Sequence, residues 1–137
     1  MKPKYPWLVI RNRFTGKVVE ELKDCSEIDD LPRGWYIAFG EQMIDELNEL
    51  LVKANYADKY RIMQIKEKFG TLRWYDGSIP KSIYPEYTAL IKKYEKLSAT
   101  TCVICGAQGE IDYKAYWLEP LCKKCLSGMK NDVPANE

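Results

Sequence analysis

The sequence predicts an α+β protein with two β-hairpins and two helices in one core and a four-cysteine module at the C-terminal end. Residues 38–55 and 85–98 repeat apolar side chains with the 3.6-residue period of an amphipathic helix. Residues 7–22 and 61–75 each place β-branched or aromatic runs on both sides of a glycine-containing turn, which is typical of a hairpin. Two Cys-x-x-Cys pairs follow the second helix.

The composition is that of a globular protein. Apolar residues make up 46% and charged residues 30% of the chain, and no stretch approaches the roughly 18 apolar residues of a membrane helix. The net charge of +1 gives no global bias toward nucleic acid. The chain has no histidine, which removes Ser-His and Cys-His nucleophilic pairs and imidazole general bases. We therefore expect a protein that is not an enzyme and does not contact a membrane.

Four cysteines, Cys102, Cys105, Cys122 and Cys125, have the spacing of a zinc site. Two thiolates three residues apart can turn toward one ion, and the connection between the pairs is long enough to complete a tetrahedral shell. Four thiolates leave no open position, so the zinc is expected to be structural. The alternatives are two redox-active dithiols or two disulfides, the latter requiring an oxidising compartment and leaving Cys25 unpaired.

The residues around the cysteines predict how this module is built. Gly106 follows the first pair as in a zinc knuckle, residues 111–118 supply a strand, and the second pair opens a short helix. A second knuckle would have glycine where Leu126 stands, which favours a treble-clef-like arrangement over a ribbon-like one. The second helix leads into the first pair without a linker. We therefore expect residues 101–137 to form a zinc module packed on an α+β core of residues 1–100.

The first 35 residues predict a hairpin followed by a loop. Strands at 7–10 and 17–22 flank a turn at 12–16. Residues 24–35 lack periodicity, which indicates a loop with room for one short helical turn. Cys25 in this loop is interpreted as a bystander thiol, because no histidine can activate it. The turn also carries basic side chains that fit a solvated tip better than a binding site: Arg11, Arg13 and Lys17.

Both predicted helices carry an apolar stripe. The acids of the first helix lie toward its N-terminal half, where they interact favourably with the helix dipole. This structural role is favoured over a hydrolase site built on carboxylates such as Asp45 or Glu67. Asp45 and Glu49 stand one turn apart, but one helix face supplies fewer oxygen ligands than a hard cation prefers. The stripes comprise Met43, Ile44, Leu47, Leu50, Leu51 and Ala54 in the first helix and Tyr84, Tyr87, Leu90, Ile91, Tyr94 and Leu97 in the second.

The second hairpin concentrates charged and aromatic side chains near its turn. Its strands, 61–68 and 72–75, meet at Phe69-Gly70. Alternation leaves both faces of the first strand mixed, so it does not decide which face is buried. Trp and Arg often dominate interface energies, although a tryptophan here fits the core equally well. The candidate binding residues are Lys66, Lys68, Phe69, Arg73, Trp74 and Tyr75.

Four blocks spread over nearly the whole chain form a specific combination. They are Tyr5-Pro-Trp-Leu with Arg11-Asn-Arg-Phe-Thr-Gly-Lys17, Gly34-Trp-Tyr with Ala38-Phe-Gly-Glu41, the KEKFGTLRWY stretch at 66–75, and the CxxCG and LCxxC cysteine pairs. This combination resembles a family of small uncharacterised proteins of bacteriophages and prophages. The resemblance implies expression in the bacterial cytoplasm during infection and brings no activity with it.

The favoured interpretation is a zinc-stabilised, non-enzymatic phage protein that binds a host or phage protein, for instance as a modulator of host defence. The alternative is a nucleic-acid-binding module. In that case the aromatic residues of the hairpin 61–75 stack on bases while its cations meet phosphates. A carboxylate hydrolase comes third. The sequence leaves the partner and the oligomeric state open.

Overall fold

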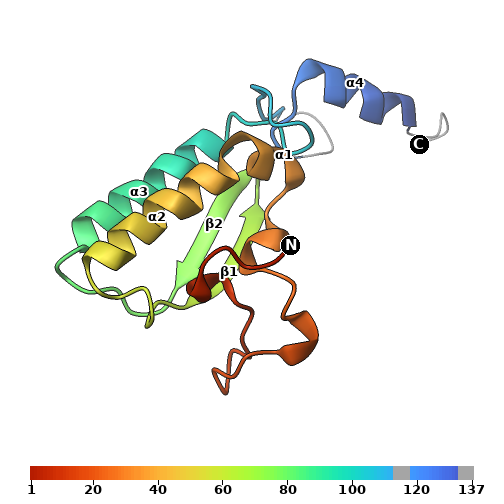
Figure 1. Ribbon diagram of the computed structural model, residues 1–137. Helices are drawn as coiled ribbons and strands as arrows, with labels where there is room; N and C mark the ends of the chain where they lie inside the picture. Colours follow the sequence, from red (N-terminus) through yellow and green to blue (C-terminus); the bar gives the residue numbers. More distant parts are fainter. Residues whose placement is uncertain (113–117, 133–137) are drawn as a thin grey trace.

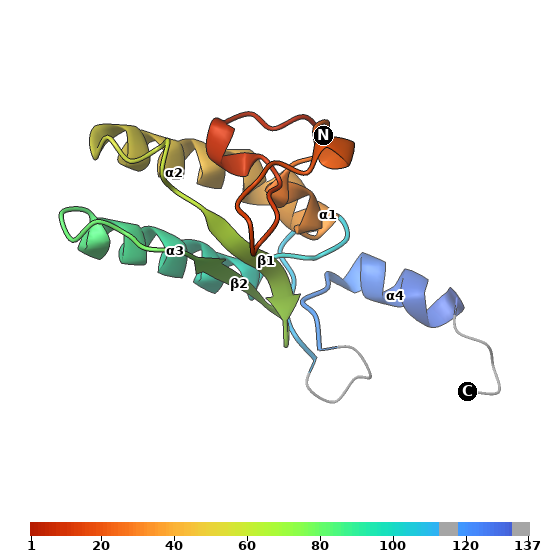
Figure 2. The same ribbon diagram turned by 90° about the horizontal axis from the view of Figure 1, so that it is seen from below.

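The computed structural model describes residues 1–112 and 118–132 and has an α+β fold. Helices α2 and α3 lie side by side and cover one face of a two-stranded antiparallel sheet (Figure 1). Helix α4 lies at one end of the molecule, beyond α1 (Figure 2). The elements in chain order are α1 (Arg33–Trp35), α2 (Glu41–Lys53), β1 (Ile62–Lys68), β2 (Thr71–Asp76), α3 (Tyr84–Ser98) and α4 (Lys123–Asp132).

The two predicted helices are confirmed as α2 and α3, and their apolar stripes form the core. At the ends of α3 the stripe leaves the protein interior, because Tyr84 and Leu97 are 57% and 42% exposed. Buried side chains of the two helices are Met43, Ile44, Leu47 and Leu51 from α2 and Tyr87, Ile91 and Tyr94 from α3.

The chain becomes helical earlier than the sequence predicts. Helix α1 begins at Arg33 and continues through a π-helical stretch, Tyr36–Gly40, into α2. A Cβ on Gly40 would lie 2.6 Å from the Tyr36 ring, so glycine allows this wider turn to pack. The loop predicted over 24–35 is therefore shorter. It does contain the expected short turn, a 3-10 helix at Glu27–Asp30 that is capped by the side chain of Ser26.

The first predicted hairpin keeps its turn but not its strands. One antiparallel bridge joins Arg11 to Val18. The strands predicted at 7–10 and 17–22 are wrong, because Trp7 and Leu8 are adjacent and both buried, at 2% and 0% exposure. A strand sends neighbouring side chains to opposite faces, so a hairpin with one solvent-facing side would expose one of the two. Short 3-10 turns replace parts of these strands, at Pro6–Leu8 and Glu20–Leu22.

The second predicted hairpin is confirmed, and its register shows which face is buried. An irregularity between Ile62 and Gln64 shifts the pairing of β1 with β2. As a result Ile62 and Ile65 are both buried, although strict alternation would place them on opposite faces. Leu72 and Trp74 of β2 are buried with them. This bulge is the reason that alternation in the sequence did not identify the core-facing side.

Phe69 and Gly70 form the two-residue turn of this hairpin. Their φ angles are +53° and +88°, and positive φ at both positions is what a type I′ turn requires. A Cβ on Gly70 would lie 2.5 Å from Cδ1 of Ile111 and 2.7 Å from the carbonyl oxygen of Leu118. The tip of the hairpin therefore rests against the cysteine module.

A buried chain of hydrogen bonds ties the hairpin to α3. Trp74 Nε1 donates to the hydroxyl of Tyr60 at 2.8 Å, and the hydroxyls of Tyr60 and Tyr87 are 2.6 Å apart. The Tyr87 hydroxyl also donates to the carboxylate of Asp76. Burial raises the pKa of both tyrosines and of Asp76. Every buried polar side-chain atom in the described residues has a partner, so this network is fully satisfied.

Two remaining expectations concern the C-terminal part and membranes. The strand predicted at 111–118 falls mainly on residues 113–117, which lie outside the described part of the chain. In the described residues, no helix combines the length and the apolar character that crossing a membrane requires.

Candidate metal centre

The four predicted ligands converge on one point. The Sγ atoms of Cys102, Cys105, Cys122 and Cys125 all lie within 4.8 Å of one another, and those of Cys105 and Cys122 are 3.6 Å apart. Four sulfurs bound to zinc at ~2.3 Å in a tetrahedron are about 3.8 Å from each other. All five cysteines are free, and Cys25 lies outside the cluster. The spacing therefore fits one tetrahedral metal ion.

The first pair lies in a tight turn that follows α3. The N–H of Cys102 donates to the carbonyl of Ala107 at 2.7 Å, and the N–H of Gly106 donates to the carbonyl of Cys102 at 3.0 Å. Gly106 has a φ of +83°, a conformation that glycine adopts without strain. This turn brings Cys102 and Cys105 to the same side, as a zinc knuckle does.

The second pair is brought back by a bridge and positioned by a helix. Glu110 and Leu121 exchange two backbone hydrogen bonds, at 3.2 and 3.1 Å. Cys122 precedes α4 and Cys125 lies in its first turn, with the N–H of Cys125 3.4 Å from the sulfur of Cys122. Free N–H groups and the helix dipole at this end favour negative charge. The start of α4 therefore brings both sulfurs of the second pair to a helix end that favours negative charge.

The cysteine knuckle is docked on α1. The N–H of Gly34 donates to the carbonyl of Val103 at 2.7 Å, and Nε1 of the fully buried Trp35 donates to the carbonyl of Thr101 at 2.9 Å. A Cβ on Gly34 would lie 2.0 Å from the carbonyl oxygen of Cys102. No spacing in the sequence indicates this contact. Gly34-Trp-Tyr stands out in the sequence, but nothing in it indicates a contact with the cysteines.

The protonation of the thiols shows why a cation fits here. Burial opposes ionisation of Cys102, but hydrogen bonds from the backbone at Cys105, Cys122 and Ile104 outweigh it and lower the pKa to about 6. The hydrogen bond with Cys122, burial and the neighbouring thiols raise the pKa of Cys125 to about 12. The thiol of Cys102 thus ionises easily, and its negative charge disfavours ionisation of Cys125. A divalent, thiophilic cation removes that repulsion, so the donor set fits such an ion.

The hairpin candidates divide between surface and core. Trp74 is only 6% exposed and belongs to the core, so it is not part of the exposed surface. Phe69 and Tyr75 are 67% and 44% exposed. The Nζ atom of Lys66 lies 5.9 Å from the centroid of the Tyr75 ring, within the range of a cation–π contact. The five candidates with accessible side chains are Lys66, Lys68, Phe69, Arg73 and Tyr75.

The carboxylates considered for catalysis lie on different elements. Asp45 on α2 accepts hydrogen bonds from the Tyr5 hydroxyl at 2.6 Å and from Lys4, which lower its pKa. Glu67 on β1 accepts from the N–H of Gly70 at 3.1 Å. Burial and then the charge of Glu67 raise the pKa of Glu119. The pairing of Glu67 with Glu119 was not predicted, because no spacing rule links residues so far apart in sequence.

The fold and the site together define an α+β protein with a candidate four-cysteine metal centre. No family model, no curated protein and no solved structure matches the chain. Its function is therefore inferred from its own residues.

Proposed function

We propose that this chain is a non-enzymatic recognition protein of bacteriophage or prophage origin that binds a host or phage protein in the bacterial cytoplasm, for example to modulate host defence. In this proposal the cysteines hold a structural zinc ion in a treble-clef-like module. The exposed face of the hairpin β1–β2 is the binding surface. The phage setting is supported by the resemblance of the four sequence blocks. The observation that carries the binding role is the separation of charge between the two faces of the hairpin.

Cations gather on the solvent-facing side of the hairpin. Lys66 and Arg73 are directly paired across the strands, and Lys68 lies on the same face next to the turn. Glu67 belongs to the opposite face and is engaged by the N–H of Gly70. Within the described residues, none of the three cations forms an ion pair. The exposed face therefore carries uncompensated positive charge.

Two aromatic rings accompany this charge. Phe69 and Tyr75 are exposed at the tip and along β2, and each has a lysine nearby. Aromatic residues and arginine are the types that most often dominate interface energies. Positive charge beside them increases the rate of association with an acidic partner. A protein with an acidic surface and an apolar pocket is the partner that this face suits best.

The zinc module has a supporting role in the proposal. A shell of four thiolates leaves no coordination position for water, which is why we propose a non-enzymatic role for the protein. The module contacts α1 through Gly34 and the hairpin tip through Gly70. A bound ion would therefore fix the turn that presents Phe69. The knuckle, the backbone bridge and the following α4 occur in the order expected of a treble clef.

Single-stranded nucleic acid is the second candidate, and one observation favours it. Lys68 lies 5.7 Å from the Phe69 ring and Lys66 lies 5.9 Å from the Tyr75 ring, so each exposed ring has a cation beside it. A base stacked on such a ring would bring its phosphate toward the lysine. Trp74 takes no part in this scheme because it is buried.

The decisive experiment compares two triple variants. The tagged protein is purified from infected cells with and without nuclease treatment, and the captured partner is then titrated against the pure protein. Lys66→Ala, Lys68→Ala and Arg73→Ala together should weaken binding by roughly tenfold or more, which corresponds to ~1.4 kcal/mol. The control variant removes three exposed lysines that form no ion pair in the described residues, Lys81, Lys92 and Lys96.

The outcomes separate the candidates. Both variants should keep the melting temperature of the parent, and the control should bind normally. A nuclease-resistant partner supports protein recognition. A fall in log K of about 0.7 per phosphate contact with log salt supports single-stranded nucleic acid. If the hairpin variant binds as tightly as the parent, this face is not the binding surface.

A further inference from the structure

Phe14 is an exposed aromatic residue on a surface that the proposed function does not use. It stands at the tip of the loop Arg11–Lys17, and 99% of its surface is accessible. A buried phenylalanine removes roughly 150–250 Å² from water. In the monomer Phe14 contributes none of this burial, so its presence has no explanation in the packing of the monomer.

The loop holds this ring in a defined position. Oδ1 of Asn12 accepts the N–H groups of Phe14 and Thr15 at 2.8 and 2.9 Å. The guanidinium of Arg11 donates to the carbonyl of Gly16 at 2.9 Å, closing the loop from the other side. A loop that is already ordered loses little conformational entropy on binding. The loop is therefore preorganised to present Phe14.

Arg13, next to the tip, is anchored, and the two ends of the loop are positively charged. Arg13 donates two hydrogen bonds of 2.9 Å to the carboxylate of Glu27, a residue that is only 4% exposed. Arg13 is thus neutralised and serves as an anchor. In the described part of the chain, Arg11 and Lys17 form no ion pair. A partner for Phe14 should therefore offer an apolar site flanked by carboxylates.

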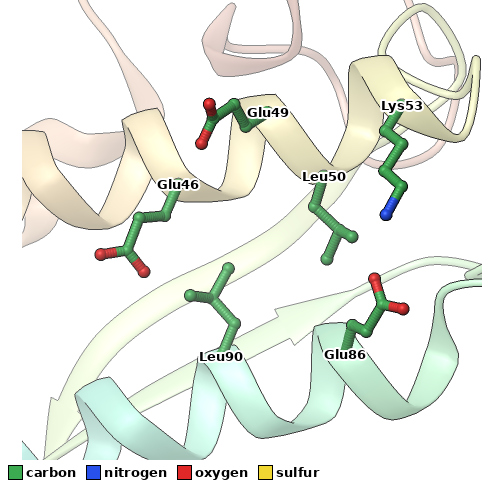
Figure 3. A pocket seen from close by; sticks show the side chains of 6 residues that line it. All are labelled: Glu46, Glu49, Leu50, Lys53, Glu86 and Leu90. Carbon is green, nitrogen blue, oxygen red and sulfur yellow. The ribbon is translucent and has the colours of Figure 1, made fainter.

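A groove of this kind lies between α2 and α3 on the same protein. It has a volume of about 540 Å³. Leu50 and Leu90 point toward each other across it, one from each helix (Figure 3). Glu49 and Glu86 line it and form no ion pair in the described residues, whereas Glu46 is already bound by Lys93. Lys53 is the cation that lines it.

We propose that the Phe14 loop of one copy docks into the α2–α3 groove of a second copy. The Phe14 ring contacts Leu50 and Leu90, while Arg11 and Lys17 face Glu49 and Glu86. The charge of the first 50 residues agrees: residues 1–23 contain six Lys or Arg and two acids, and residues 24–50 contain eight acids and one Arg. With a net charge of +1, copies repel each other little.

The contact is heterologous, because the loop and the groove are different surfaces. The two end copies of such an assembly retain a free loop and a free groove unless a ring closes. We therefore expect association that increases with concentration and decreases with salt, since salt screens the charge pairs. An anionic membrane is the competing occupant of the loop, and the experiment distinguishes the two.

Sedimentation velocity of the full chain from micromolar to millimolar concentration tests the proposal. The parent should self-associate, and Phe14→Ala should lower the association constant for self-association by roughly tenfold or more. Ile37→Ala is the matched control, because Ile37 is also apolar and 58% exposed but lies outside both surfaces. A parent that stays monomeric, or a Phe14→Ala variant that associates equally well, overturns the proposal.

A charge exchange makes the test specific. Lys17→Glu and Glu86→Lys should each weaken self-association, because each variant brings like charges together. An equimolar mixture of the two should recover it, since every loop then finds a groove of opposite charge. Failure of the mixture to recover overturns the proposed docking. Phosphatidylserine vesicles form the last arm: Phe14-dependent vesicle binding by a monomeric parent would assign the loop to a membrane instead.

Discussion

Gly34 and Gly106 meet backbone to backbone at the contact between α1 and the cysteine knuckle. A Cβ on Gly106 would lie 2.6 Å from the carbonyl oxygen of Gly34, and a Cβ on Gly34 would lie 2.0 Å from the carbonyl oxygen of Cys102. Backbone atoms cannot turn aside as a flexible side chain can. The absence of both side chains is what lets the N–H of Gly34 reach the carbonyl of Val103.

Replacing Gly34 by alanine should therefore separate the knuckle from α1. We expect a loss of about 1–3 kcal/mol or more in the free energy of unfolding, as for other overpacked sites, together with faster release of metal to a chelator. Urea unfolding and a metallochromic indicator measure the two effects. Gly128→Ala is the control: its Cβ meets nothing within 4 Å, so in helix α4 it should stabilise by ~0.5–1 kcal/mol. Equal stability of Gly34→Ala and the parent would contradict the close contact.

Removing one metal ligand should loosen the C-terminal module. Cys122→Ser takes away the candidate ligand at the start of α4, and zinc binding in four-cysteine sites contributes on the order of 10 kcal/mol, coupled to folding. We expect less than one zinc per chain by native mass spectrometry and increased hydrogen exchange between residues 100 and 130. Cys25→Ser should keep one zinc, because Cys25 lies outside the cluster. Loss of zinc in that control would refute the ligand assignment.

Trp74 should behave as a core residue. It is 6% exposed and its Nε1 donates to the Tyr60 hydroxyl. Trp74→Ala should lower stability by roughly 3–5 kcal/mol, and Trp74→Phe, which keeps a buried ring and loses the hydrogen bond, by about 1 kcal/mol. Chemical unfolding measures both. If Trp74→Ala is as stable as the parent, the assignment of the buried hairpin face is wrong.

Asp76 and Asp45 should make opposite contributions to the pH dependence of stability. Burial raises the pKa of Asp76, so its contribution is present below the unfolded-state pKa of about 3.9 and is lost as pH rises through the folded-state value. Hydrogen bonds from Tyr5 and Lys4 lower the pKa of Asp45, so its contribution is present above that unfolded-state value and is lost as pH falls through the folded one.

The two asparagine variants measure this difference directly. Between about pH 3 and pH 7, Asp76→Asn should gain stability relative to the parent as pH rises, and Asp45→Asn should lose it. The measurement is urea unfolding at a series of pH values. Parallel changes in the two variants would contradict the assigned pKa directions.

The features that could be predicted from the sequence have local signals. Helices α2 and α3 follow from a 3.6-residue period, and the cysteine cluster follows from two short spacings. The turn at Phe69-Gly70 also came from neighbouring residues alone. Each of these depends on side chains a few positions apart, where chain geometry fixes the relation between them.

The features that could not be predicted depend on tertiary contacts. The bulge between Ile62 and Gln64 leaves two isoleucines of β1 buried, and it is a feature of the pairing of β1 with β2. Trp7 and Leu8 lie in a 3-10 turn, and both side chains are buried in the core. The docking of Gly34 on Val103 joins segments distant in sequence, and nothing in either segment specifies the other.

Phe69 makes the hairpin less stable than another residue at this position would. A non-glycine residue in the left-handed region costs roughly 1–2 kcal/mol, and asparagine tolerates the φ of +53° found here far better. Phe69→Asn should therefore accelerate closure of the hairpin and raise its melting temperature while removing an exposed ring. Selection of variants for thermal stability alone would therefore replace Phe69 early. The more stable variants would lack part of the surface that is proposed to bind the partner.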